Sequence, residues 1–112
     1  MKYLMFVCVD HELATPEATK DMGERSMAWV REMDGRGVRV QGNRLQEIST
    51  ATTVRVRGGE VVLADGPFAE TKELIAGFDI LECADLDEAI EVAGKHPVAR
   101  IGSLEVRPFA ED

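Results

Sequence analysis

The stretch that decides the fold is Lys2-Tyr3-Leu4-Met5-Phe6-Val7-Cys8-Val9, near the N-terminus. Strand side chains alternate between two faces, so the odd-numbered residues of this stretch share one face, and Leu4, Phe6 and Cys8 share the other. Both sets are apolar, which is typical of a central strand covered on two sides. A sheet built around this strand must therefore bury both of its faces.

A helix is expected after this strand. Thr15 is a suitable N-cap, and Pro16 fits the first helical position because proline has no N–H to leave unbonded. Apolar residues then recur at helical spacing until Gly35, which favours the end of the helix. We therefore predict one amphipathic helix over residues 16–34 and a short strand over residues 37–41.

The second half of the chain is predicted to hold a hairpin, a strand, a helix and a last strand. A Gly-Gly pair at 58–59 lies between two β-branched runs, which is typical of a two-residue hairpin turn. Asp85 and Glu88 have the spacing of a capping box, which predicts a helix start. Strands are expected before and after that helix, over residues 77–83 and 101–107.

This element order predicts an α+β fold, with residues 1–112 forming one domain. The expected architecture is a ferredoxin-like split βαβ sheet with an inserted β-hairpin. Both helices then cover the same face of the sheet. The other face would expose roughly several hundred Å² of apolar surface, which soluble monomers rarely do. We therefore expect a homodimer in which two copies pack sheet to sheet.

Composition excludes several classes of partner. The chain has 112 residues, of which 13 are basic and 21 acidic, for a net charge of −8. Direct nucleic-acid binding and docking on anionic membranes are therefore not expected. The apolar run Leu4–Val9 is too short for a signal peptide or a membrane span, so we expect a cytoplasmic protein. Cys8 and Cys83 are expected to be buried free thiols.

The densest polar segment, Asp65-Gly-Pro-Phe-Ala-Glu-Thr-Lys-Glu73, follows the hairpin. In one interpretation it is a rigid connector between two strands, with Phe68 packed into the core. In the other, Asp65, Glu70, Thr71 and Lys72 form the rim of a pocket, where a carboxylate beside an ammonium acts as a base or a polar anchor. The sequence leaves both interpretations open.

Two charged residues in the last strand offer a second candidate site. Glu105 and Arg107 are two residues apart, so they share a face. A guanidinium in a partly closed cleft suits a carboxylate ligand, and Tyr3 and Phe78 are candidates for its apolar wall. The alternative is an ion pair between subunits.

The two histidines have different expected roles. His11 is a candidate general acid/base, with Asp10 or Asp65 nearby, or else a solvated loop residue. His96 ends a predicted helix, where positive charge interacts well with the helix dipole. Two histidines without ligand spacing do not indicate a metal site.

The polar segment at 65–73, the pair Gly77-Phe78 and the run Glu105-Val-Arg-Pro108 resemble the YCII-related family, in its DGPF-domain branch. Further similar stretches, which extend the resemblance over essentially the whole chain, are Met1–Met5, Ala51–Val56 and Asp85–Ala89.

The resemblance implies a dimeric α+β barrel, in which ferredoxin-like subunits face each other through their sheets. Relatives in this superfamily include muconolactone isomerases, small monooxygenases and a dehydrochlorinase-like member. Some proteins of the DGPF branch resemble partners of extracytoplasmic-function sigma factors. The YCII branch is associated with a His–Asp pair in its pocket, which the sequence alone does not place here.

Two functions remain after this sequence analysis. The first is a homodimer whose cleft binds a small anionic or aromatic ligand and carries out acid/base chemistry of isomerase or lyase type, without a cofactor or metal. Asp65 and His11 are its catalytic candidates. The second is a non-catalytic ligand-sensing or accessory module associated with sigma-factor-type transcription regulation, which would act through protein contacts. The expected ligand-binding residues are Tyr3, Glu70, Lys72, Phe78, Glu105 and Arg107.

Overall fold

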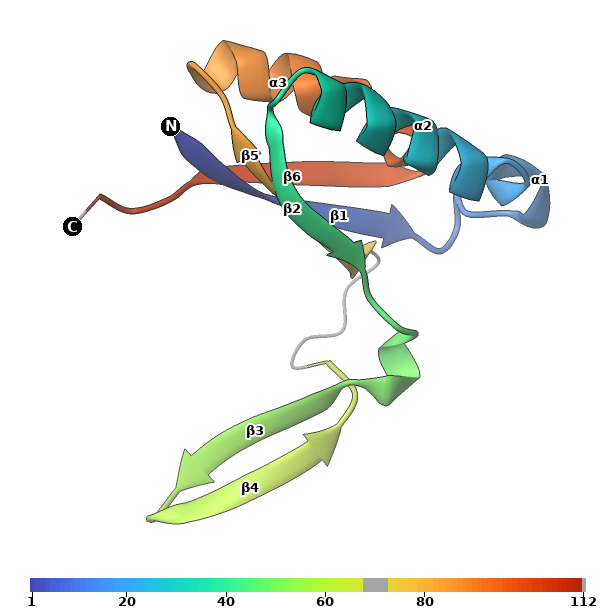
Figure 1. Ribbon diagram of the computed structural model, residues 1–112. Helices are drawn as coiled ribbons and strands as arrows, with labels where there is room; N and C mark the ends of the chain where they lie inside the picture. The colour runs from blue at the N-terminus through green and yellow to red at the C-terminus, as the bar shows by residue number, and fades with distance from the viewer. Residues whose placement is uncertain (68–72, 112) are drawn as a thin grey trace.

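A computed structural model describes residues 1–67 and 73–111. Its helices and strands follow the expected order (Figure 1). They are β1 (Lys2–Asp10), α1 (Pro16–Thr19), α2 (Met22–Gly35), β2 (Arg39–Arg44), the 3-10 helix η1 (Ile48–Thr50), β3 (Thr52–Arg57), β4 (Glu60–Asp65), β5 (Glu73–Glu82), α3 (Leu86–Gly94), the 3-10 helix η2 (Pro97–Arg100) and β6 (Gly102–Pro108).

The main sheet has the strand order β2-β5-β1-β6, with every neighbouring pair antiparallel. Since β1 and β2 both run antiparallel to β5, they are parallel to each other, as a split βαβ unit requires. The strands β3 and β4 pair separately as the inserted hairpin. The predicted ferredoxin-like α+β architecture is therefore confirmed.

The core lies between the main sheet and the two longer helices, which cover the same face (Figure 1). Trp29 of α2 is 3% exposed, and its indole Nε1 donates a hydrogen bond to the Val92 carbonyl of α3 at 2.9 Å. This bond satisfies a buried polar atom and connects the two helices. The largest fully buried side chains of the core are Tyr3, Met5, Met33, Leu81 and Val92.

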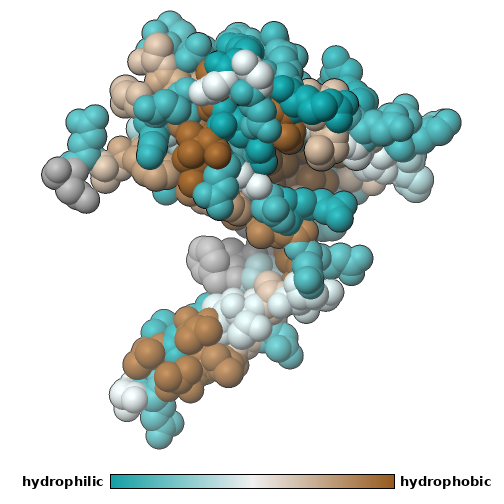
Figure 2. Space-filling view, in the orientation of Figure 1, coloured by the Kyte–Doolittle hydropathy of each residue, from teal (hydrophilic) through white to brown (hydrophobic). Residues whose placement is uncertain are grey.

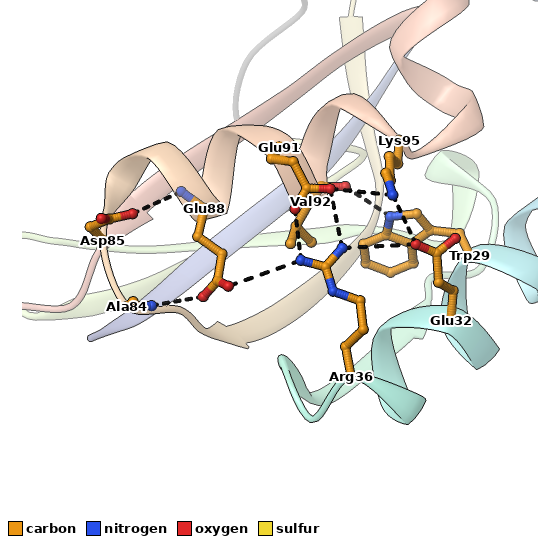
Figure 3. A network of polar contacts seen from close by, with 9 residues as sticks. All are labelled: Trp29, Glu32, Arg36, Ala84, Asp85, Glu88, Glu91, Val92 and Lys95. Atoms are coloured by element: carbon orange, nitrogen blue, oxygen red, sulfur yellow. Dashed lines mark hydrogen bonds and ion pairs between the residues drawn. The ribbon is translucent and has the colours of Figure 1, made fainter.

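An ion-pair network joins α2 and α3 on their outer surface (Figure 3). The Arg36 guanidinium donates two hydrogen bonds to Glu91, at 2.6 and 3.1 Å, and Lys95 bonds Glu32 at 3.1 Å. The hydrogen bond from Arg36 lowers the pKa of Glu91 to about 2. The network helps to hold α2 and α3 side by side over one face of the sheet. The opposite face carries no helix (Figure 1).

The predicted caps and turns are confirmed, including the Thr15 cap of the first helix. The side chain of Asp85 accepts a hydrogen bond from Glu88 N at 2.9 Å, and the hairpin glycines at 58–59 have φ of 59° and 80°. The predicted single helix over 16–34 is wrong, because it is interrupted at Asp21, where φ is −107° and ψ is 14°. Just before this position the Thr19 hydroxyl donates to the Thr15 carbonyl at 2.9 Å, and a threonine that bonds the preceding turn in this way often bends a helix.

His96 differs from its predicted role. It is 6% exposed, its Nδ1 accepts a hydrogen bond from Val98 N at 3.1 Å, and its ring lies 4.7 Å from that of Trp29. Burial lowers the pKa of His96 to about 4, so the ring is neutral and supplies no positive charge to a helix terminus.

The face of the sheet away from the helices, here called the open face, carries the other half of the apolar alternation. Its central pair is Phe6 and Phe78, and Leu4 pairs with Ile80 beside it. These four side chains are only partly buried. The hairpin, here called the arm (residues 52–65), projects away from the sheet on the side opposite the helices (Figure 1).

Candidate functional site

A cleft of about 940 Å³ opens where the arm leaves the main sheet. Strands β1, β5 and β6 supply one wall, and the segment 45–51 that leads into the arm supplies another. The described residues lining it are Cys8, Asp10, Leu45, Gln46, Glu47, Ile48, Thr50, Ala51, Pro67, Glu73, Leu74, Ile75, Ser103 and Glu105.

An irregularity in strand pairing shapes this end of the sheet. The register between β1 and β5 shifts between Val7 and Cys8, so that Cys8 lies opposite Ile75. On its other side Cys8 lies opposite Ser103 of β6. A bulge re-aims the side chains that follow it. Here Cys8, Ile75 and Ser103 therefore lie across from one another at the cleft.

Cys8 is a protonated thiol in this environment. Burial raises its pKa, the charges of Glu73 and Glu105 raise it further, and a hydrogen bond with Ser103 acts in the opposite direction. The Ser103 hydroxyl donates to Glu73 Oε2 at 2.9 Å. Since the thiolate is the nucleophilic form of cysteine, this arrangement does not favour nucleophilic catalysis by Cys8.

The polar part of the cleft is acidic. Four carboxylates line it, from Asp10, Glu47, Glu73 and Glu105, and no Lys, Arg or His is present among its described lining residues. Arg107 lies outside the lining and forms an ion pair with Glu105 at 2.8 Å. Such a surface favours a neutral or cationic ligand with hydrogen-bond donors over the anionic ligand considered from the sequence.

His11 lies in a neighbouring cavity, also of about 940 Å³, which shares the segment 45–50 with the cleft. The side chain is exposed, at the end of β1. Asp10, the preceding residue, lines the cleft and accepts a hydrogen bond from Glu12 N at 2.8 Å. The structure therefore places Asp10 and His11 at two adjoining cavities.

Tyr3 and Asp65 lie away from the cleft. Tyr3 is 2% exposed in the helix-covered core, and its hydroxyl donates to Met1 Sδ at 3.8 Å. Burial raises the pKa of Tyr3. Asp65 is exposed at the end of β4, opposite Thr52 of the arm. Neither lines either of the two cavities.

Three of the predicted residues, Phe78, Glu105 and Arg107, do lie together on the open face. Phe6 of β1 lies between Phe78 on β5 and Glu105 on β6, and Arg107 lies two residues after Glu105. Tyr3 is on the other face, so it does not share a wall with Phe78. The predicted residues Phe68, Glu70, Thr71 and Lys72 lie outside the described residues.

Sequence reasoning missed Glu47, Glu73 and Ser103 as lining residues. The alternation of β6 predicts that Ser103 and Glu105 share a face, and a pairing of β6 with β1 would have brought both to Cys8. The contribution of Glu47 depends on the path of an irregular segment, for which the sequence carries no periodic signal.

Two further properties bear on the kind of site. Within the described ranges, no group of three or more His, Cys, Asp or Glu side chains is placed to hold a metal ion. In the same part of the chain, no helix has the length and apolar character needed to cross a membrane.

Comparisons with known proteins agree with this fold. A solved structure with a TM-score of 0.56 and 14% identity is 5-chloro-2-hydroxyhydroquinone dehydrochlorinase (TftG) from Burkholderia phenoliruptrix AC1100, in complex with 2,5-dihydroxybenzoquinone. The similarity covers 100% of this chain and 96% of that one. An uncharacterized protein, R00369 of Rhizobium meliloti (strain 1021), is 39% identical over 110 residues, which cover 93% of this chain and 89% of the relative.

The family model of the YCII-related domain matches residues 1–111. The match extends from the first strand through the arm and the cleft to the end of the last strand. The chain therefore belongs to the YCII-related family.

Proposed function

We propose that this chain forms a homodimer and that its cleft binds a small neutral compound bearing hydroxyl groups. A cleft carboxylate would carry out acid/base chemistry on that compound, of isomerase or lyase type. The observation that carries the proposal is the cleft itself, in which apolar side chains and four carboxylates surround a protonated thiol.

Surface area supports the homodimer. A compact monomer of this mass should expose about 6,100 Å². The chain exposes 7806 Å², which is an excess of roughly 1,700 Å² over that value. A standard interface buries about 800 Å² on each partner, so the excess is enough for a stable dimer. The apolar open face is the natural surface for two copies to share.

The lining of the cleft supports a neutral, hydroxylated ligand. Leu45, Ile48 and Ile75 offer apolar contacts, and carboxylates accept hydrogen bonds from ligand hydroxyl groups. The cleft volume of about 940 Å³ lies within the range of small-molecule sites. The dehydrochlorinase of the same fold was solved with a hydroxylated six-membered ring, which supports the choice of such a ring as a probe.

Glu105 and Glu73 are our candidates for the general base, in place of Asp65. Both line the cleft, and both raise the pKa of the Cys8 thiol between them. A carboxylate there would take a proton from a carbon next to a carbonyl group. Returning it to another carbon gives isomerisation, and loss of a leaving group from the neighbouring carbon gives elimination.

Binding is tested by calorimetric titration with hydroquinone, a neutral diphenol, and with benzoate, an anion of similar size. We expect hydroquinone to bind wild type more tightly than benzoate does. Glu105→Gln should weaken hydroquinone binding about tenfold, because a charged acceptor is lost. Glu17→Gln, in exposed α1, is the matched control and should bind as wild type. Preferential binding of benzoate would contradict the proposed ligand class.

Chemistry is tested by proton exchange. In D₂O, wild type should speed deuterium incorporation next to the carbonyl group of 4-hydroxycyclohexanone, a neutral ring that bears a hydroxyl group. The exchange is followed by NMR, and Glu73→Gln or Glu105→Gln should reduce the rate. Exchange at the buffer rate would contradict the acid/base step.

The alternative is a non-catalytic ligand-sensing or accessory module, and one observation favours it. The two carboxylates whose charges act on Cys8 already accept hydrogen bonds, Glu73 from Ser103 and Glu105 from Arg107. One oxygen of each carboxylate is thereby occupied by a protein donor, which leaves the carboxylate less free to take a proton from a substrate. Hydroquinone binding without proton exchange would favour this alternative.

A further inference from the structure

We propose that the arm is an intersubunit clamp: its exposed apolar face packs on a second copy of this chain, and the partner's arm packs on the first in the same way. This inference deepens the homodimer proposed above and rests on it. It assigns a role to a segment that the cleft and its chemistry leave unexplained.

The two faces of the arm differ in character. Val54 lies opposite Leu63, and Val56 lies opposite Val61, so these four side chains form one face. They are 58–66% exposed. The reverse face carries Thr53 and Arg55, which are half-buried, and the less exposed Val62. The first face is thus an apolar ladder in contact with water, which Figure 2 shows as the hydrophobic patch on the arm.

The hydrogen bonds of the arm, within the described residues, hold it together and tie it to its own base. Gly66 N donates to Ala51 O at 2.7 Å, and Thr53 Oγ1 donates to Gly66 O at 2.8 Å. An isolated two-stranded hairpin is marginally stable in water and needs an apolar surface to pack against. The main sheet of its own chain does not cover the apolar ladder, because the arm projects away from it (Figure 1).

A second copy supplies a surface of the right kind and size. The arm projects on the same side as the open face, so a partner facing that sheet enters the space beside the arm (Figure 1). The six-residue strands of the arm are about 20 Å long, whereas the four strands of the main sheet span only about 14 Å from edge to edge. The arm is therefore long enough to reach across the sheet of a partner. The radius of gyration is 15.8 Å, against about 13 Å for a compact chain of this length. The arm accounts for this extended shape, and a twofold partner would enclose it.

Clamping would also affect the cleft. Thr50, Ala51 and Pro67 line the cleft and lie at the base of the arm. An arm seated on a partner holds this wall in place, whereas a free arm leaves it without support. Dimer formation and ligand binding should therefore be coupled through the base of the arm.

The test compares neighbouring positions on opposite faces of β4 by sedimentation equilibrium. Wild type should be a dimer. Val61→Asp should raise the dimer dissociation constant about 100-fold or more, because it buries a carboxylate in an apolar contact. Val62→Asp adds the same charge one residue away on the reverse face and should leave the constant unchanged. Val54→Asp, across the arm on the apolar ladder, should reproduce the effect of Val61→Asp.

Photo-crosslinking provides a second readout should the aspartate variants fail to fold. Benzoylphenylalanine at position 61 should give covalent dimers, and at position 62 it should not.

The outcomes separate this inference from the homodimer itself. A wild-type dimer that Val61→Asp leaves as tight as before overturns the clamp and keeps the homodimer. A wild-type monomer overturns both. Larger assemblies that Val61→Asp converts into stable dimers overturn the clamp as well, because the arm would then join dimers instead of holding one together.

Discussion

At the scale of single residues, burial decides the charge of His96. An unperturbed histidine titrates near pH 6.5, whereas the pKa of His96 is lowered to about 4 by desolvation. The folded state therefore binds fewer protons than the unfolded state between these two values. The stability contributed by the neutral ring is complete above about pH 6.5 and is lost as the pH falls toward 4.

This linkage predicts a difference between wild type and His96→Asn. Asparagine keeps an acceptor for Val98 N but does not titrate, so its variant should lose less stability on acidification. We expect wild type to lose about 2–3 kcal/mol more unfolding free energy between pH 7 and pH 4 than the variant loses. Urea denaturation at both pH values measures the unfolding free energy. Equal losses in wild type and variant would show that folding does not lower the pKa of His96.

Gly102 is required by the close approach of two strands. A Cβ at this position would collide with the Cys8 carbonyl oxygen of β1, beside the cleft. Gly102→Ala should therefore cost about 1–3 kcal/mol, because backbone cannot shift as cheaply as a side chain. The control is Gly94→Ala at the end of α3, where a Cβ meets nothing within 4 Å and should stabilise by up to about 1 kcal/mol. Thermal denaturation measures both variants, and a Gly102→Ala variant as stable as Gly94→Ala would contradict the prediction.

At the scale of elements, a buried ion pair reinforces the backbone pairing that attaches the edge strand β2 to β5. Arg39 Nε donates to Asp79 Oδ1 at 2.7 Å, and Asp79 is 6% exposed on the helix-covered face. Burial raises the pKa of Asp79, and Arg39 opposes this increase. A Cβ at Gly42 would collide with the same carboxylate, so β2 is shaped around Asp79.

Removing the cation should therefore destabilise the protein strongly. Arg39→Met leaves Asp79 buried without its guanidinium and is expected to cost about 3–5 kcal/mol. Arg44→Met, at the exposed end of the same strand, should change stability by less than about 0.5 kcal/mol. Hydrogen exchange should show the largest loss of protection in β2. A uniform loss over the sheet would argue against a local role of the Arg39–Asp79 ion pair.

At the scale of the whole molecule, folding and association should be coupled. If the open face and the arm are buried only in the dimer, the melting temperature must rise with protein concentration. A 100-fold increase should raise it by about 5 °C for a dimer of this size. Val61→Asp should reduce this dependence, and Val62→Asp should not. Calorimetry from 1 to 100 µM measures the effect, and a constant melting temperature would indicate that the subunit is stable alone.

Local chemistry in the sequence was enough to predict the order of the strands and helices, apart from the break in the first helix, and which residues of each strand share a face. Alternation separated Tyr3 from Phe6 within the first strand, and the Gly-Gly pair predicted the hairpin turn. These features depend on neighbours two to four residues apart, so they can be predicted from the amino-acid sequence alone. Alternation did not relate the faces of two different strands, so the predicted shared wall of Tyr3 and Phe78 was wrong. The order of elements also predicted the ferredoxin-like sheet, because few connections are sterically allowed.

The sequence by itself determined which residues are apolar, which residues of one strand share a face and how the strands connect. Only the tertiary structure decided which polar side chains meet at the cleft. Cys8, Glu73 and Ser103 come from three strands and are brought together by a shift in register, and Asp65 is carried away on the arm. The physical reason is that strand order and register are set by packing over the whole sheet, whereas propensity and alternation act over a few residues.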